Sequence, residues 1–174
     1  MSDAILKKSN HYNFDDCHPQ YVSKTQVKIV PHFTDITSPY YALAYPRVYN
    51  DNTSIFWKAF IFNSDSGKIS SAEIEVKINV GKLTNDSTIS ASAVIKNKAN
   101  FDGNSILISM ANVANGKVFY IYLKQNAIGK SYLYQVQLES STRNNRFSYD
   151  IGYGSVYRKN FAGTKLFDSL DESA

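Results

Sequence analysis

The sequence predicts an all-β protein: an antiparallel β-sandwich, jelly-roll-like, with about nine strands. The first observation is the stretch AEIEVKINV, from Ala72 to Val80, in which apolar and polar residues alternate without interruption. Side chains point to opposite faces at every step only in an extended strand, so this stretch predicts one dry face and one wet face. The second observation is that turn formers separate similar segments along the chain, and no helical pattern of normal length competes with them.

The first third of the chain predicts an irregular start and then strands constrained by proline. Residues 1–24 mix turn formers with single aromatic residues, and TQVKIVPHF is a candidate first strand closed by Pro31. Pro39 and Pro46 confine any strand around them to an edge or a bulge. The nearly apolar SIFWKAFIF, residues 54–62, predicts either a strand buried on both faces or one with aromatic contacts on each side.

Further strands follow at regular intervals. The candidates are TISASAVIK at 88–96, SILISMAN at 105–112, KVFYIYLK at 117–124, SYLYQVQLE at 131–139 and RFSYDIGYGSVYR at 146–158. Asn115-Gly116 is the strongest hairpin signal, and NKANFDGN at 97–104 predicts a polar loop. We expect an irregular N-terminal arm over 1–24, a sandwich domain over 25–159 and a short C-terminal tail over 160–174. A closed barrel is the second choice, because a sequence does not reveal closure.

The charge and the apolar content limit the partners that we expect. The formal net charge is +4, and the lysines are interleaved with acids along the chain. Proteins that bind nucleic acid usually gather Lys and Arg on one face, so we expect no nucleic acid partner. The apolar runs are only a few residues long, and the N-terminus lacks the apolar core of a secretory signal. We therefore expect the protein to be made in the cytoplasm and not to insert into a membrane.

No residue pattern predicts catalysis or a cofactor. The three histidines lie in the irregular first third, outside any recognisable nucleophile or metalloprotease motif. Residues 11–18 gather His, Asp and Cys side chains, but the second ligand pair that a zinc site needs is missing, so we expect no metal. Glu73 and Glu75 share a strand face, but it is the wet face, where solvated charges are the default. We therefore expect a protein without catalytic residues, cofactor or enzymatic activity.

The aromatic residues are the candidates for ligand binding. Aromatic residues make up 14% of the chain, and 13 of them are tyrosines. Tyr120, Tyr122, Tyr132 and Tyr134 fall on two successive strands and would form one cross-strand ladder if those strands paired. Such a ladder could stabilise the sheet or core, or present an aromatic face to a carbohydrate or a neighbouring subunit. Trp57, the single tryptophan, is a core residue if its strand buries it and a stacking platform for a sugar if it faces outward.

The order of these segments resembles the small β-sandwich modules at the ends of bacteriophage tail fibres and tailspikes. The resemblance covers roughly residues 53–153. Such modules have an aromatic strand with a Trp, a turn, an A-x-I-x-V-x-I strand and a later F-x-I-Y-L strand. The matching positions here are Trp57, then Ala72, Ile74, Val76 and Ile78, then Phe119 to Leu123.

The resemblance implies a virion protein, made in the host cytoplasm, that forms a homo-oligomer, with a trimer expected. It implies a receptor-binding or adhesin module that recognises bacterial surface polysaccharide. The alternative is a structural virion protein, such as a capsid or tail decoration protein or a fibre subunit. In that case aromatic faces and terminal arms would contact other virion proteins. An enzyme ranks third, because it would need a cleft with converging carboxylates.

Overall fold

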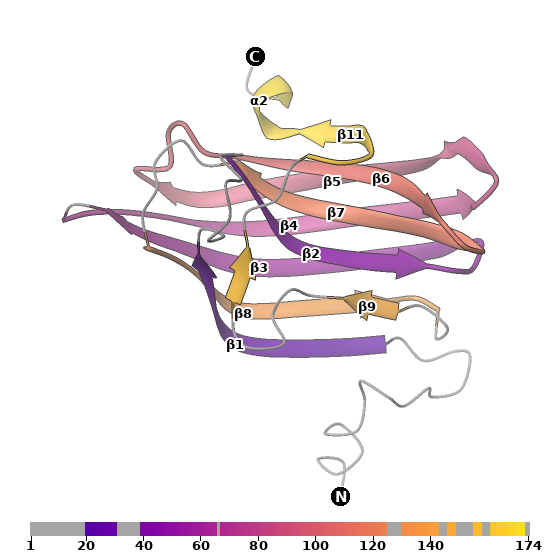
Figure 1. Ribbon diagram of the computed structural model, residues 1–174, viewed down its shortest axis with the longest axis horizontal. Helices are drawn as coiled ribbons and strands as arrows, with labels where there is room; N and C mark the ends of the chain where they lie inside the picture. The colour runs from indigo at the N-terminus through magenta and orange to yellow at the C-terminus, as the bar shows by residue number, and fades with distance from the viewer. Residues whose placement is uncertain are drawn as a thin grey trace, which may run out of the picture.

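The computed structural model describes residues 20–30, 39–65, 67–124, 130–142, 146–148, 155–157 and 161–172 (Figure 1). These ranges contain eight strands of nine residues or more, three shorter strands and one helical turn. The strands are β1 (Gln20–Val30), β2 (Tyr40–Val48), β3 (Thr53–Asp65), β4 (Lys68–Lys82), β5 (Asn85–Ala99), β6 (Ser105–Val113), β7 (Gly116–Lys124), β8 (Lys130–Ser140), β9 (Arg146–Ser148), β10 (Ser155–Tyr157) and β11 (Thr164–Asp168). The helical turn is α2 (Ser169–Glu172).

Two sheets form the sandwich. The six-stranded sheet has the order β10-β1-β8-β3-β4-β5, and the five-stranded sheet has the order β11-β6-β7-β2-β9. Every described pairing is antiparallel except that of β1 with β10. β1 pairs with β8 in one sheet and β2 with β7 in the other, which is the nested pairing of a jelly roll, while β3, β4 and β5 form a meander. The predicted all-β antiparallel sandwich is confirmed.

The alternating segment predicted from the sequence lies in β4, at the centre of the longest hairpin. β3 and β4 pair without interruption from Thr53 opposite Val80 to Asp65 opposite Lys68. Along β4 the apolar residues from Ala72 to Val80 are buried, and the residues between them are half-buried or exposed. The alternation thus places one face of the six-stranded sheet on the core and the other toward solvent.

The core lies between the inner faces of the two sheets. Its largest fully buried side chains are Trp57, Tyr41, Phe119, Leu43, Ile55, Ile61, Ile74, Ile78, Ile106 and Ile108. Tyr122 is also fully buried, but it belongs to a second cluster described below. In β3, Ile55, Trp57, Ala59 and Ile61 are buried, whereas the phenylalanines that alternate with them are only half-buried. Of the two predictions for this strand, burial on both faces is therefore wrong, and β3 carries aromatic side chains on each face.

Two pairings decide where the candidate residues lie. Asn115 has a φ of 65° in the turn between β6 and β7, so the predicted Asn-Gly hairpin is confirmed. The condition for a cross-strand tyrosine ladder, pairing of β7 with β8, is not met, because β7 pairs with β6 and β2 while β8 pairs with β1 and β3 in the other sheet. β1 begins at Gln20, and β11 pairs with β6 and adds the C-terminal segment to the edge of the five-stranded sheet (Figure 1). Among the described residues, no helix has the length and apolar character to cross a membrane.

Candidate functional site

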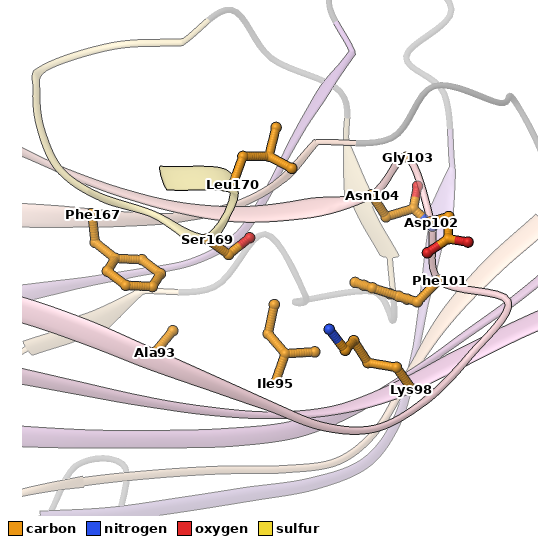
Figure 2. A pocket seen from close by; sticks show the side chains of 10 residues that line it. All are labelled: Ala93, Ile95, Lys98, Phe101, Asp102, Gly103, Asn104, Phe167, Ser169 and Leu170. Carbon is orange, nitrogen blue, oxygen red and sulfur yellow. The ribbon is translucent and has the colours of Figure 1, made fainter. Parts of the chain in front are cut away.

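A pocket of about 400 Å³ opens at the edge of the sandwich. It lies between β5, an outermost strand of the six-stranded sheet, and β11, an outermost strand of the five-stranded sheet. We call it the edge pocket. Its lining residues are Ala93, Ile95, Lys98, Phe101, Asp102, Gly103, Asn104, Phe167, Ser169 and Leu170 (Figure 2). Figure 2 shows side chains of β5 on one side and of β11 and α2 on the other, with the loop after β5 closing one end. Segments far apart in the sequence therefore build this pocket together.

The floor of the edge pocket is apolar. Phe101 is 5% exposed and Phe167 is 8% exposed, and both pack into the main core. Ala93 and Ile95 on β5 are partly buried and pack against the core. A ligand in this pocket would therefore place its apolar atoms on aromatic and aliphatic carbon.

Two asparagines, Asn97 near the end of β5 and Asn100 in the loop after it, form hydrogen bonds to β4. The side-chain amide of Asn97 donates a hydrogen bond of 2.6 Å to a carboxylate oxygen of Glu73, and that of Asn100 donates one of 3.0 Å to the carbonyl of Ile69. Both asparagines have a φ of 51°, in the left-handed region that Asn tolerates better than most residues. These contacts fix the approach of the loop to the pocket, so the sequence of the loop determines where Asp102 lies.

A tight turn places the polar rim. The backbone N–H of Asn104 donates to the carbonyl of Phe101 at 3.2 Å, and Gly103 between them has a φ of 84°. A left-handed φ of this kind suits glycine, because it has no Cβ to collide with the backbone. The turn buries Phe101 in the floor and leaves Asp102 exposed and Asn104 half-buried at the rim.

The other wall comes from the end of the chain. The hydroxyl oxygen of Ser169 accepts the backbone N–H of Ile106 at 2.9 Å, and this bond joins α2 to β6. The N–H of Leu170 donates to a carboxylate oxygen of Asp168 at 3.0 Å, which starts the helical turn. Leu170 itself is 52% exposed, so the lip of the pocket carries a large apolar side chain.

The rim carries one positive and one negative charge. Among the residues that the structure describes, neither Lys98 nor Asp102 forms an ion pair. Lys96, by contrast, pairs with Glu75 at 2.9 Å on the outer face, and its hydrogen bond lowers the pKa of Glu75. An ammonium, a carboxylate and an amide above an apolar floor can together donate to and accept from hydroxyl groups on a neutral ligand.

Tyr120 and Tyr122, two of the predicted binding residues, lie on the outer face of the five-stranded sheet. They belong to an outer tyrosine cluster formed by Tyr40, Tyr45, Tyr120, Tyr122 and Phe161, with ring centroids 5.1 to 6.3 Å apart. Tyr122 is only 1% exposed, whereas Tyr120 is half-buried. Most of the Tyr122 ring is therefore out of reach of a ligand, whereas part of the Tyr120 ring is accessible.

Residues 161–163, which we call the strap, cross this cluster. The backbone N–H of Ala162 donates to the hydroxyl oxygen of Tyr122 at 3.1 Å, and the hydroxyl of Ser109 donates to the carbonyl of Ala162 at 2.6 Å. Burial raises the pKa of the Tyr122 hydroxyl. The hydroxyl of Tyr122 is thus engaged in holding the strap to the sheet.

The remaining candidate residues lie elsewhere. Trp57 has no exposed surface, so the folded chain keeps its ring out of reach of a glycan. The side chains of Tyr132 and Tyr134 lie outside the described part of the structure, and the backbones of these residues pair with Phe62 and Phe60 in the other sheet. The five candidates therefore do not form a single face.

The sequence predicts no metal site. The cluster of His, Asp and Cys residues at 11–18, which was weighed as a metal site, lies outside the described residues. Within the described ranges, no three His, Cys, Asp or Glu side chains come together as metal ligands. The residues of the edge pocket were not singled out from the sequence, although the turn formers in NKANFDGN marked the loop that supplies its rim.

Comparisons with known proteins give two structural matches. No family model and no curated protein matches the sequence. One match is the tailspike protein of Acinetobacter baumannii phage AM24, with a TM-score of 0.39, 5% identity, and coverage of 80% of this chain and 28% of that one. The other is the tailspike protein gp49 of Acinetobacter baumannii bacteriophage Fri1, described as a capsular polysaccharide depolymerase. It has a TM-score of 0.34, 11% identity, and coverage of 92% of this chain and 23% of that one.

Both matched proteins are phage tailspikes, the class that the strand order of the sequence resembles, and this chain spans only about a quarter of their length. Both TM-scores lie below 0.5, so the fold assignment rests on the strand pairing described above. The expectation of a protein without enzymatic activity is corrected, because the second matched protein is described as a depolymerase.

Proposed function

We propose that this chain is a module of a bacteriophage tail protein that recognises a bacterial surface polysaccharide, and that the edge pocket binds one unit of that polymer. The observation that carries the proposal is the composition of the pocket, in which Lys98, Asp102 and Asn104 surround an apolar floor. The ligand class is the one that the description of the second matched protein names for that protein.

The chemistry of the pocket suits a sugar. A sugar ring presents C–H groups on its faces and hydroxyls around its rim. The floor, which includes Phe101 and Phe167, would take the C–H groups, and the Asp102 carboxylate would accept hydrogen bonds from adjacent hydroxyls. The pocket volume of about 400 Å³ lies within the range of about 300–1,000 Å³ that is usual for small-molecule sites.

The proposal extends to assembly and location. The protein would be part of a virion, and its binding face would be presented in three copies by a homotrimer. Light scattering tests this part, because a trimer has a mass of about three times 19.6 kDa. A monomer in solution would contradict trimer formation by this chain alone and leave the binding test below unaffected.

Calorimetric titration with a panel of purified bacterial capsular polysaccharides tests recognition. We expect Asp102→Asn to weaken binding by roughly tenfold or more, since a hydrogen bond to a charged group contributes about 1.5–3 kcal/mol. Lys98→Gln should also weaken binding, and Lys82→Gln, at an exposed lysine of β4 outside the pocket, is its matched control. Affinity should change little between low and moderate salt, because apolar contacts and hydrogen bonds rather than ion pairs would dominate the binding.

Two results would contradict the proposal. One is that no polysaccharide of the panel binds to the intact chain. The other is that Asp102→Asn and Lys98→Gln bind as tightly as the unmodified chain, which would move the site elsewhere. Release of reducing ends in the same incubations is measured in parallel, and it would assign cleavage as well as recognition to this chain.

A further inference from the structure

A second hollow, of about 640 Å³, lies on the outer face of the six-stranded sheet, and we call it the outer hollow. It shares no lining residue with the edge pocket. Its lining residues are Ser54, Ile55, Phe56, Lys77, Asn79, Glu139, Ser140 and Ser141. Three adjacent strands, β8, β3 and β4, supply all of them except Ser141, which directly follows β8.

Phe56 is the central apolar group of the outer hollow. Its neighbours Ile55 and Trp57 are buried in the core, so the alternation of β3 directs Phe56 to the outer face, where it is half-buried. Within the described ranges, no other aromatic ring lies against it. Its ring therefore offers a partly exposed apolar surface on the outer face of the sheet.

The register places opposite charges on the two sides of this ring. Phe56 pairs with Lys77 of β4 on one side and with Glu139 of β8 on the other, and directly paired residues share a face. Both charged side chains are exposed, and neither forms an ion pair with any described residue. The surroundings of the ring are thus charged but have no net charge.

Hydrogen bonds fix the polar end of the outer hollow. The hydroxyl of Ser54 donates to the amide oxygen of Asn79 at 2.6 Å, which turns the NH₂ group of Asn79 away from Ser54 and leaves it able to donate to a ligand. The backbone N–H of Ser54 donates to the hydroxyl oxygen of Ser141 at 2.8 Å, and the N–H of Ser141 donates to the carbonyl of Ser54 at 2.9 Å. The donors and acceptors beside Phe56 are therefore held in place before any ligand arrives.

We propose that the outer hollow is a second carbohydrate site, which binds a neutral hexose unit stacked on Phe56 between Lys77 and Glu139. The C–H face of a pyranose ring lies against the aromatic ring, and the carboxylate and the ammonium bind hydroxyls on opposite sides. This inference rests on the proposed function in that the same polymer supplies the ligand, and engagement of two sites by one polymer raises its apparent affinity.

The test is an NMR titration of the chain with neutral hexaoses of glucose, galactose and mannose, each in the α- and the β-linked form. The chemical shifts of the backbone amides of Ser54, Asn79 and Glu139 report binding in the outer hollow. We expect at least one hexaose to shift these signals, and Phe56→Leu to weaken its binding by about tenfold. Val94→Ala is the matched control, because Val94 is an apolar residue, 52% exposed, on β5 of the same sheet and outside the outer hollow. Glu139→Gln removes the charge of an exposed side chain of β8 and should weaken binding by a similar factor. The fluorescence of buried Trp57 verifies that each variant is folded.

Each outcome separates this inference from the proposed function. If the capsular panel binds to the intact chain and Phe56→Leu binds the panel and the hexaoses unchanged, the outer hollow is overturned as a site and the proposed function stands. If Phe56→Leu weakens hexaose binding and Asp102→Asn does not weaken polysaccharide binding, the outer hollow is supported and the edge pocket is overturned. Failure of every hexaose to shift the amide signals of the outer hollow overturns the inference, whether or not the panel binds.

Discussion

Substitution of Tyr122 tests how the C-terminal strap is held to the five-stranded sheet. Tyr122→Phe removes only the hydroxyl oxygen that accepts the Ala162 N–H at 3.1 Å. The ring stays, and with it the contacts to Tyr40 at 5.9 Å, Tyr120 at 5.7 Å and Phe161 at 5.1 Å. The variant therefore removes the hydrogen bonding of the Tyr122 hydroxyl and keeps the packing of the ring.

The expected loss is small, because water can replace the lost partner. A net hydrogen bond contributes about 0.5–1.5 kcal/mol, and a donor left unpaired in the interior costs about 1–3 kcal/mol. Ala162 is exposed, so its N–H can bond to water, and the lower range applies. We expect the free energy of unfolding to fall by about 1 kcal/mol for Tyr122→Phe. For Tyr122→Ala we expect a fall of about 3–5 kcal/mol, since the buried ring is also lost.

Urea unfolding followed by the fluorescence of Trp57 measures both variants, because this single tryptophan is fully buried in the core. Tyr120→Phe is the matched control: Tyr120 is half-buried on the same strand face, and its hydroxyl makes no hydrogen bond within the described ranges. An equal loss in Tyr120→Phe, or no loss in Tyr122→Phe, would refute the assignment of the hydroxyl to the strap.

The difference in stability between the unmodified chain and Tyr122→Phe should also depend on pH. Burial raises the pKa of Tyr122 in the folded state above its ordinary value of 10.0. The stability linked to the neutral hydroxyl is therefore complete below about pH 10 and is lost as the pH rises through the raised pKa. The difference in unfolding free energy between the unmodified chain and Tyr122→Phe should be constant below that pH and shrink above it. A difference that grew with pH would contradict this account.

Three further predictions concern stability. Gly163→Ala should lower the unfolding free energy by about 1–3 kcal/mol, because Gly163 has a φ of 85° and an added Cβ would lie 2.6 Å from the carbonyl oxygen of Met110; calorimetry measures the loss. The hydrogen bond from Lys96 lowers the pKa of Glu75, so the stability it provides is present above about pH 4.5 and lost on acidification. Acid titration should therefore show the difference between the unmodified chain and Glu75→Gln vanishing at low pH. Lys117→Met keeps the buried stem and should cost only about 1 kcal/mol in urea unfolding, because the acidic partner of the ammonium is 68% exposed and regains water.

The sequence predicted those parts of the fold that depend on local alternation. A strand with one face on the core carries an apolar residue at every second position. The buried face of β4 could therefore be predicted directly from the residues between Ala72 and Val80. The Asn-Gly turn likewise fixes its own hairpin, because Asn115 takes the left-handed conformation that the turn demands.

The sequence did not predict which sheet each strand enters. β7 carries apolar residues on both faces: Phe119 and Ile121 face the core, and Tyr122 faces the strap. Such a strand can pair with β8 or with β2 and satisfy the same pattern, and only the global packing chooses between them. The tyrosine ladder, which required β7 to pair with β8, is therefore excluded, because the two strands belong to different sheets.

The candidate sites depended on contacts that no single segment encodes. Asp102 looked like a turn residue in a polar loop, and it becomes part of a pocket only because Phe167 and Leu170 return to the same edge. Phe56 looked like one apolar residue in an apolar strand, and its charged neighbours Lys77 and Glu139 come from two other strands.

The C-terminal segment links the strap to the edge pocket. The strap ends at Gly163, and β11 begins at the next residue and carries Phe167 into the floor of the pocket. Because β11 pairs with β6 through only a few residues and with a register shift after Lys165, the hydrogen bonds of the strap add to its attachment. Loosening the strap should therefore weaken ligand binding in the edge pocket and leave binding in the outer hollow unaffected, since the lining of the outer hollow includes no residue of the strap or of β11. In the binding assays, Tyr122→Phe thus distinguishes the two sites without altering a residue of either.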